Sequence, residues 1–375
     1  MRGGVISTAC VLWLVAMQAL ACSSDLPTLT ECEPVGGVSP VCGFHNPEDL
    51  ALLPGGGWIL ASQGGEMGGG EGRPGSLVGY RVADGRLHKL YPPEPGAAAS
   101  SGSQPSPGWG SPECPGPPDP AVFLPHGVDV ARPGTGARSL AVVNHGGRES
   151  IEFFEIGYAV DAPALFWRGC VLLPPEVWPN DVALLPGGGV MATNMMPGMR
   201  GAAAAWGIVK LLFGRDTGEV LEWRPDSGWA ALPESAGSGP NGIAISPDGS
   251  EVYVAEWGRD LLVRLRRDER GRTRRDSVAL PHHPDNMTWT RDGRLLVTGQ
   301  IGPIGDLMTC SRIETGTCGM PFSVVLVDPA SLEVVPVLDS PTAVIGAGTV
   351  ALEVGDEIFI GTFAGDRLAR TSFHH

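Results

Sequence analysis

The strongest constraint on the fold is a sequence unit that recurs along the chain. Each copy has a pair of polar or small residues, preceded by a proline in all but the last copy. An alternating apolar run, a turn that contains Gly and a second apolar run follow, a pattern typical of a β-hairpin. Six hairpins, with further alternating runs between them, predict an all-β fold that closes into a six-bladed β-propeller. The copies span 47–62, 125–144, 179–194, 240–256, 284–299 and, in its weakest form, 347–362.

Two segments interrupt the repeats. Residues 92–120 are rich in Pro, Gly and Ser, which predicts a surface loop. Residues 195–213 are apolar and rich in Ala, which predicts a small helix inserted above one blade, near the face where a site would open. The propeller domain is expected to span 47–375.

The N-terminus has the pattern of an export signal. A short positive region with Arg2 precedes an apolar run, Val5–Leu20, that is too short to span a bilayer comfortably. Residues 1–21 are therefore predicted to be a signal peptide, and 22–46 an N-terminal segment and tether. Cys22, followed by two serines, resembles the lipidated cysteine of bacterial lipoproteins, although Ala19 stands where Leu is usual. We expect an envelope protein, in the periplasm or at the outer membrane, held to the membrane by lipid on Cys22, or a secreted protein if Cys22 is not modified.

The cysteine count agrees with this expectation. Of eight cysteines, Cys10 would leave with the signal and Cys22 would carry the lipid. An even number then remains for disulfides in an oxidising compartment. Connectivity is open, but Cys310 with Cys318, and Cys32 with Cys42, are each able to close one short loop. The six are Cys32, Cys42, Cys114, Cys170, Cys310 and Cys318.

The charge balance argues against a nucleic-acid partner. The formal net charge is −15, and the chain contains only two lysines, Lys89 and Lys210. Binding to phosphate backbones requires clustered positive charge, which an acidic chain of this kind lacks.

The polar pair of each repeat is the candidate site. It precedes the innermost strand of its blade, so successive pairs converge on the central channel. Carboxylate and carboxamide oxygens arranged in a ring are ligands suited to calcium. The alternative is that such residues cap strand ends and satisfy turn amides, but five pairs in register favour a metal. One calcium shell would comprise Glu48, Asn180, Asn241, Asp285 and Asn286, and a second, deeper ion would use Asp49 and Asp181.

The motifs also resemble a known family. LPHGVDVA followed by LAVVNHGGRESIEFFEI is similar to the paraoxonase/arylesterase family of calcium-dependent lactonases. The PHG, VVNH, PND, NGI-SPDG and DN motifs occur in the family's order over nearly the whole mature chain. The resemblance implies a catalytic calcium on the five ligands above, and a structural calcium on Asp49, Asp181 and the Val128 carbonyl. It further implies an active-site dyad of His126 and His145, and a pocket residue at Thr349.

Three departures from the family pattern bear on the inner ion, the disulfides and substrate preference. In the family, a disulfide joins the N-terminal segment to the last strand, but no cysteine follows Cys318 in this chain. Met195 and Met196 replace an acidic residue and a histidine. Gln300 stands where the family pattern leads one to expect histidine.

The resulting hypothesis is a calcium-dependent hydrolase of small-molecule lactones and aryl esters. Calcium would polarise the carbonyl, His126 would deprotonate water, and His145 would relay the proton. Asp285 or Glu48 as base or nucleophile remains an alternative within the same site. Two other functions stay open: a non-catalytic, calcium-stabilised binding propeller, and a sugar-lactonase of the gluconolactonase/senescence-marker group, which lacks the PHG…VVNH pairing.

Overall fold

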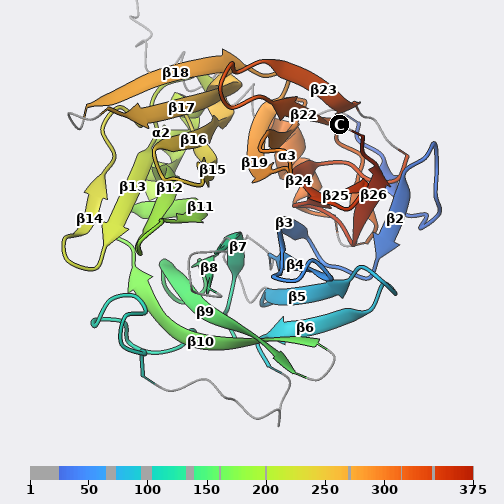
Figure 1. Ribbon diagram of the computed structural model, residues 1–375. Helices are drawn as coiled ribbons and strands as arrows, with labels where there is room; N and C mark the ends of the chain where they lie inside the picture. The colour runs from blue at the N-terminus through green and yellow to red at the C-terminus, as the bar shows by residue number, and fades with distance from the viewer. Residues whose placement is uncertain are drawn as a thin grey trace, which may run out of the picture.

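Six four-stranded antiparallel sheets surround a central axis in the computed structural model, and each forms one blade (Figure 1). The structure describes residues 25–64, 73–93, 104–131, 139–159, 162–198, 201–268, 272–313, 315–339 and 343–374. The prediction of a nearly all-β, six-bladed propeller is confirmed. The segment 1–24, which holds the expected signal, Cys10 and Cys22, lies outside these residues. Within them, no helix is long and apolar enough to cross a membrane.

The blades follow one another in chain order. The first contains β3 (Pro47–Leu52), β4 (Trp58–Gln63), β5 (Ser76–Arg81) and β6 (Leu87–Tyr91). The second contains β7 (Pro125–Val130), β8 (Ser139–Asn144), β9 (Ser150–Ala159) and β10 (Ala162–Leu172). The third contains β11 (Val177–Leu184), β12 (Val190–Pro197), β13 (Glu219–Arg224) and β14 (Gly228–Ala231).

The fourth blade contains β15 (Pro240–Ile245), β16 (Glu251–Glu256), β17 (Leu261–Arg267) and β18 (Thr273–Ala279). The fifth contains β19 (His283–Trp289), β20 (Leu295–Gln300), β22 (Phe322–Val327) and β23 (Val334–Asp339). The sixth contains β24 (Gly348–Val354), β25 (Glu357–Thr362), β26 (Arg367–Ser372) and, as its outermost strand, β2 (Ser39–Cys42). Because β2 comes from the N-terminal side, the propeller begins earlier than residue 47 and its ring is closed by hydrogen bonds between the two ends of the chain.

Alternation along the strands explains how the blades pack. In β8, Leu140 and Val142 face the first blade, whereas Ala141 and Val143 face the third. Side chains of a strand point alternately to its two sides, and here both sides are covered, so the strand is apolar throughout. Six apolar clusters of this kind fill the six interfaces between neighbouring blades. Each fully buried Val or Leu contributes about 1.5–3 kcal/mol relative to an exposed one.

The innermost strand of every blade has an irregularity at the predicted polar pair. In β3, for example, the pairing with β4 shifts between Pro47 and Asp49. Equivalent shifts occur near the start of β7, β11, β15, β19 and β24. Such bulges bend a strand and change the direction of its side chains, so the repeated motif encodes six local kinks around the channel.

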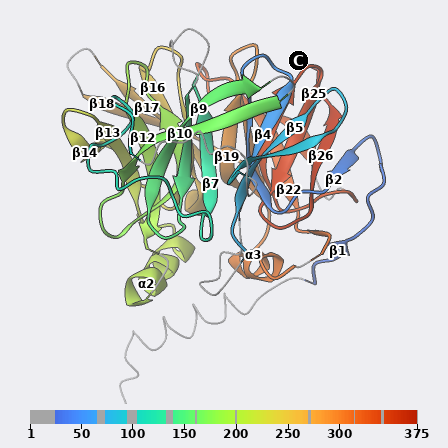
Figure 2. The ribbon, with the colours of Figure 1, turned by 90° about the horizontal axis from the view of Figure 1, so that it is seen from below.

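Two short helices lie on the same face of the propeller, α2 (Gly201–Leu212) and α3 (Ile304–Cys310) (Figure 2). The helix predicted in 195–213 is confirmed, but it begins at Gly201, because Met195 and Met196 continue strand β12. A single 3₁₀ turn, Trp257–Arg259, follows β16, and β1 (Thr28–Leu29) pairs with β21 (Thr317–Cys318).

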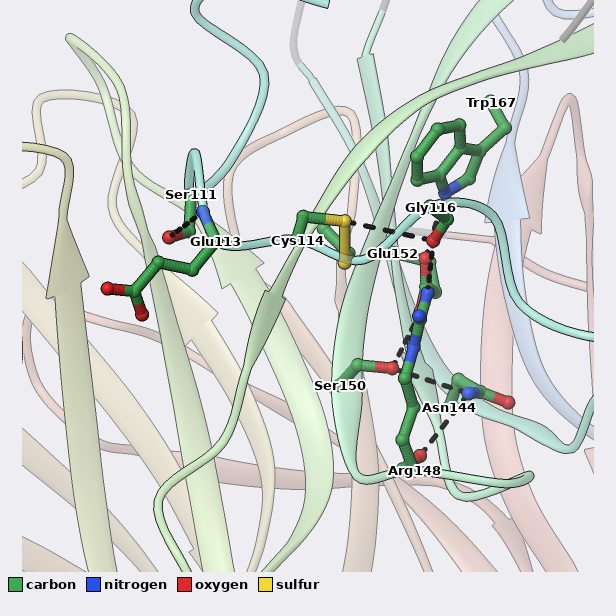
Figure 3. The surroundings of a disulfide bond; sticks show 10 residues. Ser111, Glu113, Cys114, Gly116, Asn144, Arg148, Ser150, Glu152 and Trp167 are labelled. Carbon is green, nitrogen blue, oxygen red and sulfur yellow. Dashed lines mark hydrogen bonds and ion pairs between the residues drawn. A yellow bond between two sulfur atoms is a disulfide. The ribbon is translucent and has the colours of Figure 1, made fainter. Parts of the chain in front are cut away.

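The described residues contain three disulfides. The pairs Cys32–Cys42 and Cys310–Cys318 each close a short loop, as expected. The third joins Cys114 to Cys170 of β10. Consequently, the described part of the segment predicted as a surface loop, 104–120, is tied covalently to the second blade (Figure 3).

Candidate functional site

The innermost strands approach one another closely at the channel, and glycines of the repeat permit this. A Cβ atom at Gly127 would lie 2.6 Å from Asp181 Cα on the next blade. A Cβ atom at Gly242 would lie 2.8 Å from Asn286 Cα. Glycine as the second residue of the pair, at Gly127 and Gly242, therefore reflects crowding at the axis, which brings the polar residues of neighbouring blades together.

Five buried polar residues from four blades form what we call the central oxygen cluster: Glu48, Asn180, Asn241, Asp285 and Asn286. Contacts within and around the cluster orient its amide groups. Asn286 Nδ2 donates to Glu48 Oε1 at 2.8 Å, and the Asn241 side chain donates to Asp285. Asn180 Nδ2 points to Met195 Sδ at 3.8 Å. The amide nitrogens thus face protein partners and the amide oxygens face elsewhere.

Four oxygens of the cluster have no hydrogen-bond partner, although all are buried. They are Glu48 Oε2, Asn180 Oδ1, Asn241 Oδ1 and Asn286 Oδ1. A buried acceptor without a partner costs about 1–3 kcal/mol, so four such atoms in one place indicate a missing cation or donor.

This donor set fits calcium. Calcium takes six to eight oxygen ligands, and the cluster offers carboxylate and carboxamide oxygens from five residues, which leaves positions for water or substrate. Among the residues described, no three His, Cys, Asp or Glu side chains converge closely enough to hold a metal by themselves. The candidate site therefore depends on its asparagines, which is a pattern for a hard cation and not for zinc.

Burial and mutual repulsion make the carboxylates costly to ionise without a cation. Burial raises the pKa of Glu48 well above its usual range, and the charge of Asp285 adds to this. Burial also raises the pKa of Asp285 to about 7, despite hydrogen bonds from Gln300 and Asn241 that favour the ionised form. A bound divalent cation would reverse this balance.

Asp49 and Asp181, the residues predicted to hold a deeper ion, link neighbouring blades. Asp49 Oδ2 accepts from the Val128 N–H at 2.7 Å, and Asp181 Oδ2 accepts from the Ile243 N–H at 2.8 Å. Burial, followed by the charge of the adjacent carboxylate, raises the pKa of each well above its usual range. These bonds match the alternative role of satisfying backbone amides. The second ion, with the Val128 carbonyl as a ligand, stays a prediction.

The two predicted dyad histidines are in contact beside the oxygen cluster. His126 Nδ1 lies 3.0 Å from His145 Nε2, and His126 Nε2 lies 3.6 Å from Glu48 Oε2. Burial, with a smaller effect of His145, lowers the pKa of His126 to about 3. At neutral pH, His126 is accordingly a neutral imidazole with one nitrogen lone pair available.

Beyond the dyad, His145 Nδ1 lies 2.6 Å from Glu149 Oε2, and the His145 ring stacks on Trp178 at 5.0 Å between centroids. The sequence analysis had singled out neither Glu149 nor Trp178. Their roles depend on the path of the loop after β8 and on the packing of two blades, for which residue spacing offers no signal.

An apolar cover lies next to the oxygen cluster on the side of the two helices. It touches the polar site at three points: Met195 contacts Asn180, Trp178 contacts both histidines, and Trp257 Nε1 donates to Gln300 Oε1 at 3.2 Å. Gln300 in turn donates to Asp285 Oδ2 at 2.6 Å, so it helps to orient this carboxylate of the cluster. The cover consists of Trp178, Met195, Met196, Leu211, Trp257, Ile304 and Leu307.

Thr349 is fully buried, and its hydroxyl donates to the Glu48 backbone carbonyl at 2.5 Å. The contact that the structure provides is therefore a support for Glu48, and contact between Thr349 and a substrate stays a prediction. Thr193 has a similar place in the third blade, where its hydroxyl donates to the Asn241 carbonyl at 2.5 Å.

Comparison with known protein families finds a match over part of the chain. Residues 158–303 match the family described as SMP-30/gluconolactonase/LRE-like region, which is less than half of the chain. The match includes Asn180, Asn241, Asp285 and Asn286 and excludes Glu48 and both dyad histidines. No curated protein is similar enough in sequence to match this chain.

Several solved structures share the fold. A luciferin-regenerating enzyme is 13% identical, with 92% of this chain and 95% of that chain covered and a TM-score of 0.54. A gluconolactonase from Xanthomonas campestris is 18% identical, with 94% and 96% covered and a TM-score of 0.52. Regucalcin from Agrobacterium tumefaciens, a calcium-binding protein, is 13% identical, with 94% and 96% covered and a TM-score of 0.50. At these identities the likeness establishes the propeller fold alone.

Proposed function

We propose that this protein is a calcium-dependent hydrolase of lactones, with aryl esters as further substrates, of the paraoxonase/arylesterase type. The four unpartnered oxygens of the central oxygen cluster, next to a contacting histidine pair, carry this proposal. A gluconolactonase and a calcium-binding regucalcin among the proteins of similar fold support it.

The roles of the residues follow from their environments. The cluster residues Glu48, Asn180, Asn241, Asp285 and Asn286 would hold the ion. Calcium bound there would supply a Lewis acid for the substrate carbonyl. Neutral His126, with a lone pair beside the cluster, is suited to accept the proton of an attacking water, and His145 lies in position to share the resulting charge.

The apolar cover favours a substrate with an apolar chain or ring. Sugar lactones carry several hydroxyl groups, which lose hydrogen bonds when they are placed against Trp and Met side chains. The residues of the cover that contact the site, Trp178, Met195 and Trp257, offer mainly apolar surface. The sugar-lactonase alternative is favoured by the family region over 158–303. The proposed function and the sugar-lactonase alternative differ in the substrate that the cover would accept.

A first experiment measures hydrolysis of a panel of alkyl lactones, gluconolactone and phenyl acetate by the purified protein. Each assay is run with calcium, with chelator, and with calcium restored. We expect activity that disappears on chelation and returns with calcium, and that favours alkyl lactones. Preference for gluconolactone would support the sugar-lactonase alternative. No hydrolysis by folded, calcium-loaded protein would support a binding propeller.

A second experiment tests the cover itself. Replacement of Trp178 with Ala should raise KM for alkyl lactones about tenfold, because the side chain that stacks on His145 also borders the site. Trp206 of α2 is 60% exposed, so Trp206→Ala is a matched control in which KM should be unchanged. Equal effects of the two substitutions would contradict the assignment of the cover to the substrate.

We also propose export and anchoring by lipid on Cys22, on the sequence pattern described above. Mass spectrometry of the protein from its native envelope should find Cys22 as the modified N-terminus. The Cys22→Ser variant should leave the membrane fraction, and retention there would contradict the anchor.

A further inference from the structure

We infer that Glu149 is a positioning residue that sets the tautomers of both dyad histidines, so that His126 presents a nitrogen lone pair to the central channel. This inference rests on the proposed function, since it concerns the same histidines. It starts from a continuous line of side chains, with Glu149 Oε2 2.6 Å from His145 Nδ1 and His145 Nε2 3.0 Å from His126 Nδ1.

The hydrogen-bonding capacity of each group determines where the protons lie. An ionised carboxylate only accepts hydrogen bonds, so the proton between Glu149 and His145 belongs to His145 Nδ1. The Nε2 atom of neutral His145 is then an acceptor, and it takes a hydrogen bond from Nδ1–H of His126. Nε2 of His126 is left without a proton, and this is the atom 3.6 Å from Glu48 Oε2 in the oxygen cluster.

Without Glu149, no carboxylate would hold the proton on His145 Nδ1. A neutral imidazole pair can carry its protons in two directions, and in one of them His126 would turn an N–H toward the channel and could not act as a base. The carboxylate selects the productive direction and also stabilises the positive charge that the pair gains when His126 takes a proton. In hydrolases with a Ser-His-Asp triad, the aspartate likewise fixes the tautomer of the histidine and stabilises its positive charge.

The exposed fractions of the three side chains show that the line from His126 through His145 to Glu149 runs from the site to the surface. The His126 and His145 side chains are 8% and 5% exposed, whereas Glu149 is 34% exposed. Glu149 thus keeps contact with water, while the ring it orients is shielded. The stack of His145 on Trp178 prevents the ring from rotating away.

The backbone that carries Glu149 is held by other residues. Asn144 Nδ2 donates to the carbonyls of Gly146 and Arg148 at 3.1 and 3.3 Å, which closes the turn. The Arg148 guanidinium donates to buried Glu152 and to the Gly116 carbonyl of the segment fixed by the Cys114–Cys170 disulfide (Figure 3). Removal of the Glu149 side chain should therefore leave the loop in place.

The test compares two substitutions with a control in calcium-loaded protein. Glu149→Leu removes the acceptor, and Glu149→Gln keeps an oxygen acceptor but adds a donor and removes the charge. Glu155→Leu is the control, because Glu155 is a partly exposed glutamate of the same blade that pairs with Arg168. The readouts are the ring-nitrogen tautomers of His126 and His145 by ¹H–¹⁵N NMR, assigned with His→Gln variants, and kcat and KM on an alkyl lactone.

In the wild type we expect both rings to carry the proton on Nδ1. Glu149→Leu should give mixed tautomers and lower kcat about 10–100-fold with KM unchanged, and Glu149→Gln should lie between the two. Glu155→Leu should change neither. Wild-type tautomers in Glu149→Leu would overturn the inference, as would a kcat equal to that of the control. Absence of lactone hydrolysis in the wild type would refute the proposed function, while the NMR comparison would still decide whether Glu149 sets the tautomers.

Discussion

Replacement of Asp285 with asparagine should remove a large part of the pH dependence of stability in the calcium-free protein. Burial raises the pKa of this carboxyl from its ordinary value of 3.8 to about 7. A carboxyl with a raised pKa favours the folded state while it is protonated. Its contribution is complete below pH about 4 and is lost as the pH rises through about 7.

The magnitude follows from the size of this difference. Each pKa unit corresponds to about 1.4 kcal/mol, so ionisation of Asp285 costs the calcium-free folded state about 4 kcal/mol above pH 7. An unfolding entropy of about 2.1 cal/mol/K per residue for a chain of this length converts this into a fall in Tm of about 5 °C. The charge of Asp285 also raises the pKa of Glu48, so the substitution should relieve part of that repulsion as well.

The assay is thermal unfolding between pH 5 and pH 8 with chelator present. About 2.6 kcal/mol of this cost develops between pH 5 and pH 8, so the wild-type Tm should fall across this range by about 3 °C more than that of Asp285→Asn. Asp248→Asn is the control: Asp248 lies on the surface, and its hydrogen bonds from Ser246 and Ser250 lower its pKa to about 2, so it is ionised throughout. Equal pH dependence of Tm in the wild type and Asp285→Asn would refute the reasoning.

Calcium should reverse the effect in the wild type alone. Because ligands bind the ion in their ionised form, the rise in Tm on addition of calcium should grow from pH 5 to pH 8. At a free calcium concentration of 100 times Kd, the gain is about 2.7 kcal/mol, or about 3 °C. Asp285→Asn should lose most of this gain.

Three further predictions concern the dyad, the blade contacts and the covalent framework. His126→Gln should lower kcat about 100-fold while calcium affinity, measured by calorimetry, stays unchanged; unchanged turnover would show that His126 is not the base. Gly127→Ala should destabilise the protein by about 2–3 kcal/mol in urea unfolding, because its Cβ would collide with the next innermost strand, whereas Gly57→Ala, with open space around it, should be nearly neutral. Replacement of both Cys114 and Cys170 with Ser should cost about 4 kcal/mol, since the disulfide spans a sequence separation of 56; a loss below about 1 kcal/mol would mean that the loop is held by other contacts.

Local patterns in the sequence were enough to predict the propeller and the residues at its channel. Hairpin patterns are local, and alternation along a strand decides which side chains lie at each interface between blades. The repeated proline and the pair after it marked the start of five innermost strands, beginning with Pro47 in β3, and the weaker sixth copy, without the proline, marked β24 at Gly348. Two of the three disulfides joined cysteines close enough in sequence to be foreseen.

How those residues contact one another depends on the closed ring of blades. Asn286 and Glu48 are 238 positions apart, and their hydrogen bond, which leaves Glu48 Oε2 and Asn286 Oδ1 without partners, depends on closure of the ring. Closure itself uses β2, whose short sequence shows no sign of the sixth blade. Glu149 and Trp178 reach His145 from a loop and from the neighbouring blade. Local patterns specify the direction of a side chain within its strand, whereas the hydrogen-bond partners at the axis are set by contacts between blades.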